Sequence, residues 1–346
     1  MRTNWSQALQ IAAVYVGTVV GAGFATGKEI VEFFSRFGFI GMIGILMGGY
    51  IFIFLGSKLM RIAAAIGADS YQDFNLYLFG RHFGTLINIL MLVMLFGVSA
   101  VMLSGAGAVF DEQLGISRIS GIIVTIILSI FVMIVGIKGL FAVNIFVVPM
   151  MVTFSFYLMF ISVQLPHFQD QLLSIPFAED GWKSVVAPFS YTAFNLSLAQ
   201  AVLVPVAKEI KDVRTIKWGG ILGGLALTFI LLSSHTTLIM LPDFRSYEIP
   251  MAVTMKNLAS GFYWIYVFII YGEIFTSIIG NIFGLERQLK KYVKAPSIII
   301  VSGIFVIVFL ISFVDYGTLL SYLYPIFGYI SLFFIILLWI KPLEEM

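Results

Sequence analysis

The 346-residue chain contains no cysteine. Disulfide bonds, thiolate metal sites and cysteine nucleophiles are therefore all excluded. Charge is also scarce, because only 11% of the residues are Asp, Glu, Lys or Arg. The formal net charge is +2 and the basic residues lie in short connections, so the chain offers no basic face for nucleic acid.

Patterns typical of enzymes are missing as well. The three histidines, His82, His167 and His235, are scattered and show no HExxH or other metal-ligand spacing. The sequence has no GxSxG elbow and no P-loop. No connection is long enough to hold an ATP-hydrolysing domain. We therefore expect no enzyme and no organic cofactor, and any transport must draw its energy from an ion gradient.

Apolar residues dominate instead, at 60% of the chain, with a mean hydropathy of +1.03. This composition places the chain in a lipid bilayer, where about 20 helical residues cross the hydrocarbon. We predict an all-α membrane protein with ten transmembrane helices. The expected spans are Ala8–Phe34, Phe39–Met60, Phe83–Val109, Ile119–Val135, Leu140–Val163, Trp182–Val206, Ile216–Leu241, Phe262–Leu285, Pro296–Phe313 and Leu319–Ile340.

The distribution of basic residues predicts the orientation. If the N-terminus is cytoplasmic, most of the 20 lysines and arginines fall on the cytoplasmic side. The positive-inside rule then places both termini in the cytoplasm and requires an even number of spans. The residues on the outer side would be Arg36, Arg118, Lys183, Arg245 and Lys256, with Lys28 inside the first span.

The first span contains the glycine-rich stretch GTVVGAGFATG, Gly17 to Gly27. Glycine destabilises a helix interior, so we interpret the stretch as a break, with one helix stopping near Gly17 and another starting near Phe24. Inside a membrane, such a backbone must be buried in protein or line a cavity, where its carbonyl and amide groups are free to bind ligands. The alternative is close helix packing, because Gly17/Gly21 and Gly23/Gly27 are GxxxG pairs.

The sixth span carries a matching anomaly, a polar cluster that includes Thr192 and Asn195. We predict a second break there, and therefore two halves of five spans. Because five is odd, the second half is inverted relative to the first. The halves would be residues 1–163 and 182–346, joined by an extracellular connection, 164–181, within one membrane domain. The cluster's alternative role is to bind neighbouring helices.

These features resemble the LeuT fold of the amino acid, polyamine and organocation transporter superfamily. GTVVGAG, followed by a short helix, resembles the first-helix break of sodium-coupled neurotransmitter symporters. VPVAKEIKDVRTIKWGG, after the sixth span, resembles a pattern of amino acid permeases. The chain resembles the uncharacterised bacterial YkvI-type membrane proteins, and spore germinant permeases share the ten-span plan.

The resemblance implies a sodium site. Its ligands would be the carbonyls of Gly17, Val20 and Glu273 and the side chains of Thr276 and Ser277. Oxygens without a fixed charge suit a monovalent ion. The alternative is that the two hydroxyls bond to their own helix.

Two departures from the family pattern refine this expectation. Phe24 stands where the symporters carry an asparagine ligand, so we expect one Na⁺. The fifth span lacks the internal lysine of some proton-coupled relatives, which favours sodium over protons.

Glu273 supports a proton-coupled alternative, because a carboxylate within a span is costly and marks a functional site by default. A structural ion pair, for example with Lys28, would be the other role. Lys28, Glu29 and Glu32 form a charged turn that is either a solvated face or an outer gate. The connection Pro242–Ser260 either dips over the vestibule or is a plain surface loop.

For the substrate, the expected break supplies amides for a carboxylate, and the sixth span supplies carbonyls around Tyr191 to Phe194 for an ammonium group. Together they describe an amino acid. Phe24, Tyr191 and Phe194 would line an apolar pocket. The predicted substrate-binding residues are Gly21, Ala22, Gly23, Phe24, Tyr191, Thr192, Phe194 and Asn195.

The sequence thus predicts a bacterial inner-membrane secondary transporter that carries a small amino acid or related amine together with Na⁺. A proton-coupled carrier that uses Glu273 is one alternative. The other is a ligand sensor that does not transport and resembles a germinant-receptor permease subunit.

Overall fold

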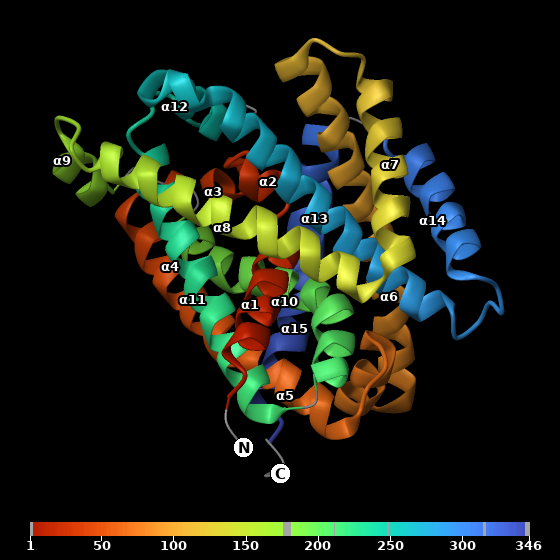
Figure 1. The fold of residues 1–346 in the computed structure, drawn as a ribbon. Coiled ribbons are helices and arrows are strands. Elements are labelled where there is room, and N and C mark those ends of the chain that lie inside the picture. The colour runs from red at the N-terminus through yellow and green to blue at the C-terminus, as the bar shows by residue number, and fades with distance from the viewer. Residues whose placement is uncertain (1–2, 176–180, 211, 248, 314–315, 343–346) are drawn as a thin grey trace.

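The structure, a computed structural model, describes residues 3–175, 181–210, 212–247, 249–313 and 316–342, and all regular elements in these ranges are helices (Figure 1). Seven of the helices described are long and apolar enough to cross a membrane. The predicted all-α membrane class is therefore confirmed. Arg2, Lys211 and residues 176–180, which entered the orientation and domain predictions, lie outside the described residues.

The elements in chain order are α1 Trp5–Val19, α2 Ala22–Ala25, α3 Lys28–Phe33, the 3₁₀ turn Ser35–Phe37, α4 Phe39–Ile51, the π-helical turn Phe52–Gly56, α5 Ser57–Ile66, α6 Tyr71–Leu114, α7 Arg118–Val135, α8 Ile137–Ser162, α9 Phe168–Leu173, α10 Gly181–Ile210, α11 Val213–Leu238, α12 Pro250–Leu258, the 3₁₀ turn Ser260–Phe262, α13 Tyr263–Leu289, α14 Ser297–Ile311 and α15 Tyr316–Ile340.

Every expected span falls on helical structure, although the count of ten stays a prediction. The first span is divided among α1, α2 and α3. The second is interrupted by the π-helical turn, and the Tyr15 hydroxyl donates to the Phe52 carbonyl at this turn (3.0 Å). The ninth span, α14, has only 15 helical residues.

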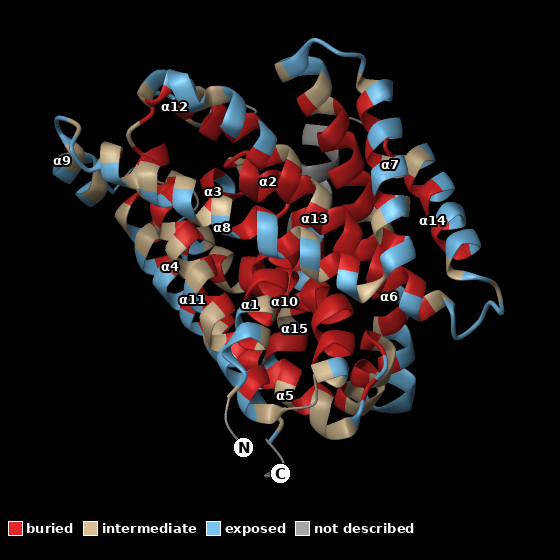
Figure 2. Ribbon diagram, viewed as in Figure 1, coloured by how far each residue is buried: buried red, intermediate tan, exposed pale blue. Residues whose placement is uncertain are grey.

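The interior of the molecule is built around α1 and α2. Every residue from Ile11 to Gly27 is buried, and α1 packs against α8, α10, α11 and α13 (Figure 2). A helix that is buried on all sides has no polar face, which explains the apolar character of this stretch. Large apolar side chains are instead exposed on outer helices such as α7 and α14, as expected of a surface that faces lipid.

The sixth span, α10, is one continuous helix, so the predicted break there is wrong. Its middle has no glycine, and the side chains of Ser190, Thr192 and Asn195 bond to carbonyls about one turn back in the same helix. Thr192 Oγ1 donates to the Pro188 carbonyl (2.7 Å), and Asn195 Nδ2 donates to the Tyr191 carbonyl (2.9 Å). These side chains therefore donate hydrogen bonds to carbonyls of their own helix, and the helix stays continuous.

The connection between α11 and α13 packs onto the turn between α2 and α3. The Met251 amide donates to the Thr26 carbonyl (3.0 Å), and Lys28 Nζ donates to the Tyr247 carbonyl (2.8 Å). Helix α12 thus lies across one end of the molecule, close to α2 and α3 (Figure 1).

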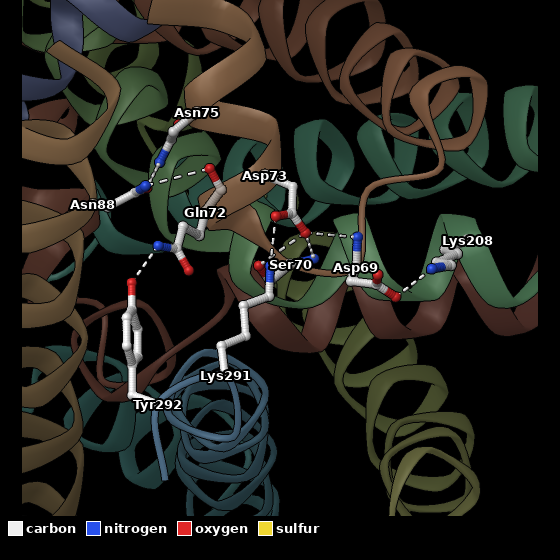
Figure 3. A network of polar contacts seen from close by, with 9 residues as sticks. All are labelled: Asp69, Ser70, Gln72, Asp73, Asn75, Asn88, Lys208, Lys291 and Tyr292. Carbon is white, nitrogen blue, oxygen red and sulfur yellow. Dashed lines mark hydrogen bonds and ion pairs between the residues drawn. The ribbon is translucent and has the colours of Figure 1, made fainter. Parts of the chain in front are cut away.

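A polar network lies at the other end, where α5 meets α6 (Figure 3). Asp69 pairs with Lys208 at the end of α10, and Asp73 pairs with Lys291 just after α13 (2.5 Å). Asp73 also accepts the backbone amides of Asp69 (3.0 Å) and Ser70 (3.2 Å) and so caps α6. The network ties three separate parts of the chain together.

Candidate functional site

The break in the first span is real and short. Helix α1 ends at Val19, Val20 and Gly21 are extended, and α2 begins at Ala22. The expected limits, near Gly17 and Phe24, were therefore too wide. The last carbonyls of a helix have no intrahelical partner, and here they begin with Gly17, because the Val20 amide still reaches the Val16 carbonyl (2.8 Å).

The free carbonyls of α1 meet two hydroxyls of α13. Thr276 Oγ1 lies 3.1 Å from the Gly17 carbonyl oxygen and 2.9 Å from that of Glu273. Ser277 Oγ lies 3.2 Å from the Gly17 carbonyl oxygen and 2.5 Å from that of Val20. The structure thus brings all five predicted oxygens into one buried group, which we call the oxygen cluster. Thr276 also bonds to its own helix, as the alternative interpretation expected.

Asn144 of α8 extends this cluster and was missed in the sequence. A Cβ atom built on Gly17 would lie 1.7 Å from Asn144 Oδ1, so the amide fills the space that glycine leaves open. Asn144 Nδ2 donates to the Leu140 carbonyl (2.8 Å), whereas Oδ1 is buried and has no hydrogen-bond partner in the described part of the chain. The signal was an amide within an apolar run, where a polar side chain is costly.

The cluster is therefore a set of neutral oxygens, and beside it lies Asn144 Oδ1, an acceptor that receives no hydrogen bond in the described structure. Such a set fits a monovalent cation in a membrane interior, because carbonyl and hydroxyl dipoles can replace water around it. Among the residues that the structure places, no group of three or more His, Asp or Glu side chains is arranged to hold a metal ion.

Glu273 lies on α13, the helix that also carries Thr276 and Ser277, and it is fully buried. Neither carboxyl oxygen has a hydrogen-bond partner among the described residues. Lys28, its suggested partner, instead directs its Nζ to the Tyr247 carbonyl. The ion pair between the two, which was the alternative role for Glu273, is therefore not formed in this structure.

The predicted aromatic pocket is divided. Tyr191 packs against Phe33 and Phe34, with ring centroids 5.2 and 5.0 Å away, whereas Phe194 packs against Tyr324 of α15 (4.7 Å). Phe24 is buried at the start of α2. The carbonyls of α10 around Tyr191 belong to a continuous helix, so they do not form the predicted ammonium site.

The amide end of α2 is already in contact with other groups. The Ala22 amide donates to Met102 Sδ (3.0 Å). The Glu29 carboxyl group lies against Gly23, where an added Cβ would be 2.2 Å from Oε1. Glu29 is only 2% exposed. The sequence grouped it with a charged turn, although its position four residues before buried Phe33 was a sign that it faces inward.

No protein-family model matches the chain. Among curated proteins, the chain is 47% identical over 336 residues to the uncharacterised membrane protein YkvI of Bacillus subtilis (strain 168), and the match covers 97% of this chain and 96% of that protein.

Three solved structures are similar in fold. A Na⁺-coupled sialic acid symporter, substrate-bound and outward-open, has a TM-score of 0.68 at 10% identity and covers 94% of this chain and 75% of its own. MhsT in complex with L-phenylalanine has a TM-score of 0.63 at 15% identity, with 93% and 81% covered. A variant of the Eremococcus coleocola manganese transporter has a TM-score of 0.64 at 13% identity, with 96% and 79% covered. The predicted LeuT-like fold is thereby confirmed.

Proposed function

The chain belongs to the family of the membrane protein YkvI and is a multi-pass membrane protein with the LeuT fold, and from this premise we propose that it is a secondary active transporter. It carries a small amino acid or related amine together with one Na⁺, by alternating access, across the bacterial inner membrane. Both termini lie in the cytoplasm.

The oxygen cluster is the single observation that supports this proposal best. Carbonyls from the α1 break and hydroxyls from α13 lie within 2.5 to 3.2 Å of one another. In this proposal Na⁺ binds there, held by Gly17, Val20, Glu273, Thr276 and Ser277. An ion shared by the two helices would couple its own binding to the relative position of α1 and α13.

Substrate binds close to the break in the same proposal, with Gly21, Ala22, Gly23 and Phe24 on one side and Tyr191, Thr192, Phe194 and Asn195 of α10 on the other. Lys28 acts as part of an outer gate, since its bond to the Tyr247 carbonyl joins α3 to the segment before α12.

The test combines binding with flux. NaCl should raise the thermal midpoint of the purified protein more than KCl or choline chloride does, because an ion that binds only the folded state stabilises it. A Thr276→Ala/Ser277→Ala variant should lose this difference. Thr153→Ala is the matched control, because that exposed hydroxyl bonds only to the Pro149 carbonyl of its own helix (2.8 Å).

Flux is then measured in liposomes with radiolabelled amino acids and amines. Uptake that requires an imposed Na⁺ gradient supports symport. Equal uptake in Na⁺ and choline⁺ contradicts sodium coupling, and tight binding without uptake favours a sensor over a transporter.

Glu273 favours a second candidate, a proton-coupled carrier. Its buried carboxyl oxygens have no hydrogen-bond partner in the described structure, so the group is available to exchange a proton. This candidate predicts that Glu273→Gln abolishes uptake while removal of Na⁺ leaves uptake unchanged.

A further inference from the structure

Glu29 is a buried acidic residue next to the α1 break that the proposed mechanism has not used. Its side chain folds back onto Gly23, with Cδ 2.7 Å and Oε1 2.2 Å from the position of an added Cβ. It is only 2% exposed, and none of the ion pairs within the described ranges includes it. A buried carboxylate without a partner is costly, and a cation that binds next to it relieves that cost.

Aromatic rings lie close to this carboxylate. Phe33 follows Glu29 by one turn of α3, and its ring packs against that of Tyr191, with centroids 5.2 Å apart. The rings of Phe33, Phe34 and Phe52 pack around Tyr191, with centroids 5.0 to 6.3 Å from that of Tyr191. We call these three rings and Tyr191 the aromatic group. Faces of aromatic rings attract ammonium ions.

The same place is unfavourable for a substrate carboxylate. Glu29 would repel it at close range. The Ala22 amide is the first of α2 and so has no carbonyl partner within that helix. It already donates a hydrogen bond to Met102 Sδ. The chain thus places an acidic side chain of its own at the point where an amino acid would have to place its carboxylate.

From these contacts we infer that the cargo is a cationic amine without a free carboxylate, and that Glu29 binds its ammonium group with the aromatic group around it. This inference rests on the proposed transport function and narrows its substrate class.

The experiment compares probes that share a carbon skeleton and differ in charge. Phenylethylamine, phenylalanine and 3-phenylpropionate form one series, and isoamylamine, leucine and 4-methylpentanoate form a second. Binding to the purified full-length protein is measured in NaCl by thermal shift and by isothermal titration calorimetry. Uptake of the same probes is measured in liposomes.

We expect wild type to bind the amine of at least one series more tightly than its amino acid or acid. Glu29→Gln should weaken amine binding roughly 10- to 100-fold, the value of one hydrogen bond to a charged group. Glu29→Asp should keep part of the affinity. Glu32→Gln is the matched control, because Glu32 lies on the same helix, is half exposed, and pairs with Arg36. A monodisperse elution profile and a retained Na⁺-dependent shift would show that Glu29→Gln is folded.

Three results would overturn the inference: tighter binding of the amino acid or the acid, no binding of any amine, or wild-type amine affinity in Glu29→Gln. The last result would mean that Glu29 is a neutral structural acid. Amine binding without uptake would leave the inference standing and contradict transport, whereas amino acid uptake that is insensitive to Glu29→Gln would contradict the inference alone.

Discussion

At the scale of single residues, the candidate ion site depends on how Asn144 packs against Gly17. The glycine has no side chain, and the Asn144 amide occupies the space that one would need, 1.7 Å from the Cβ position. Thr276 Oγ1 is 3.3 Å from the same position. The glycine stretch was interpreted as a helix break or as a site of close helix packing, and Gly17 shows both features. It lets Asn144 pack closely, and its carbonyl belongs to the oxygen cluster.

Gly17→Ala should be costly for this reason. The new methyl group must push the Asn144 amide aside, and overpacking of this kind costs about 1–3 kcal/mol. We expect a lower thermal midpoint in detergent and a smaller stabilisation by NaCl. Gly303→Ala is the control, because no atom lies within 4 Å of its Cβ position in α14 and alanine favours a helix. A wild-type response of Gly17→Ala to NaCl would contradict the proposed ion site.

At the scale of elements, the polar network joins the α5–α6 connection to the ends of α10 and α13 (Figure 3). The bond to the Lys208 ammonium group holds the pKa of Asp69 below its usual range. The pair can therefore contribute to stability at neutral pH and lose that contribution in acid.

Asp69→Asn tests this pair. The contribution is fully present above the unfolded-state pKa of about 3.9 and is lost as the pH falls through the lower pKa of the folded state. Because the Asp69 side chain is 63% exposed, we expect the variant to lose only about 0–1 kcal/mol at pH 7. The difference in thermal midpoint from wild type should shrink as the pH falls below about 3.9. Asp111→Asn, an exposed residue of α6 outside the network, is the control. A difference that persists in acid would assign the effect to packing.

The two predicted breaks show what sequence patterns can decide about an element. Four glycines predicted the α1 break, because glycine weakens a helix whatever surrounds it. The polar cluster of α10 could not show whether that helix is broken or continuous. Hydroxyl and amide side chains are compatible with both, depending on which groups they bond to. Thr192 and Asn195 bond to their own helix. Only the structure gives that direction.

At the scale of the whole molecule, composition was enough to predict a helical membrane protein, and family motifs were enough to place the oxygen cluster. The inward direction of Glu29 and Asn144 was not predicted, because it depends on contacts between helices that are far apart in sequence. Asn144 on α8 meets Gly17 on α1, although the two residues are 127 positions apart in the sequence. The sequence pattern grouped Glu29 with Lys28 and Glu32 in a charged turn, either a solvated face or an outer gate, yet packing buries Glu29.

The predicted orientation can be tested directly, since the chain contains no cysteine and needs no background substitutions. Ser246→Cys lies between α11 and α12, and Lys294→Cys lies between α13 and α14; both positions are exposed. In intact cells, a membrane-impermeant maleimide should label Ser246→Cys, and it should label Lys294→Cys only after permeabilisation. The reverse pattern would place the termini outside.

Three of the five oxygens in the cluster, those of Gly17, Val20 and Glu273, belong to the peptide backbone. No substitution deletes a backbone carbonyl, so a mutational scan would register Thr276 and Ser277 and overlook most of the proposed ion site. The Val20 side chain takes no part in that proposed site, and because it is fully buried its size is constrained by packing alone. Insertion or deletion of one residue between Gly17 and Gly21 would instead rotate the carbonyls away from α13, and the site would be lost with every ligand residue still present.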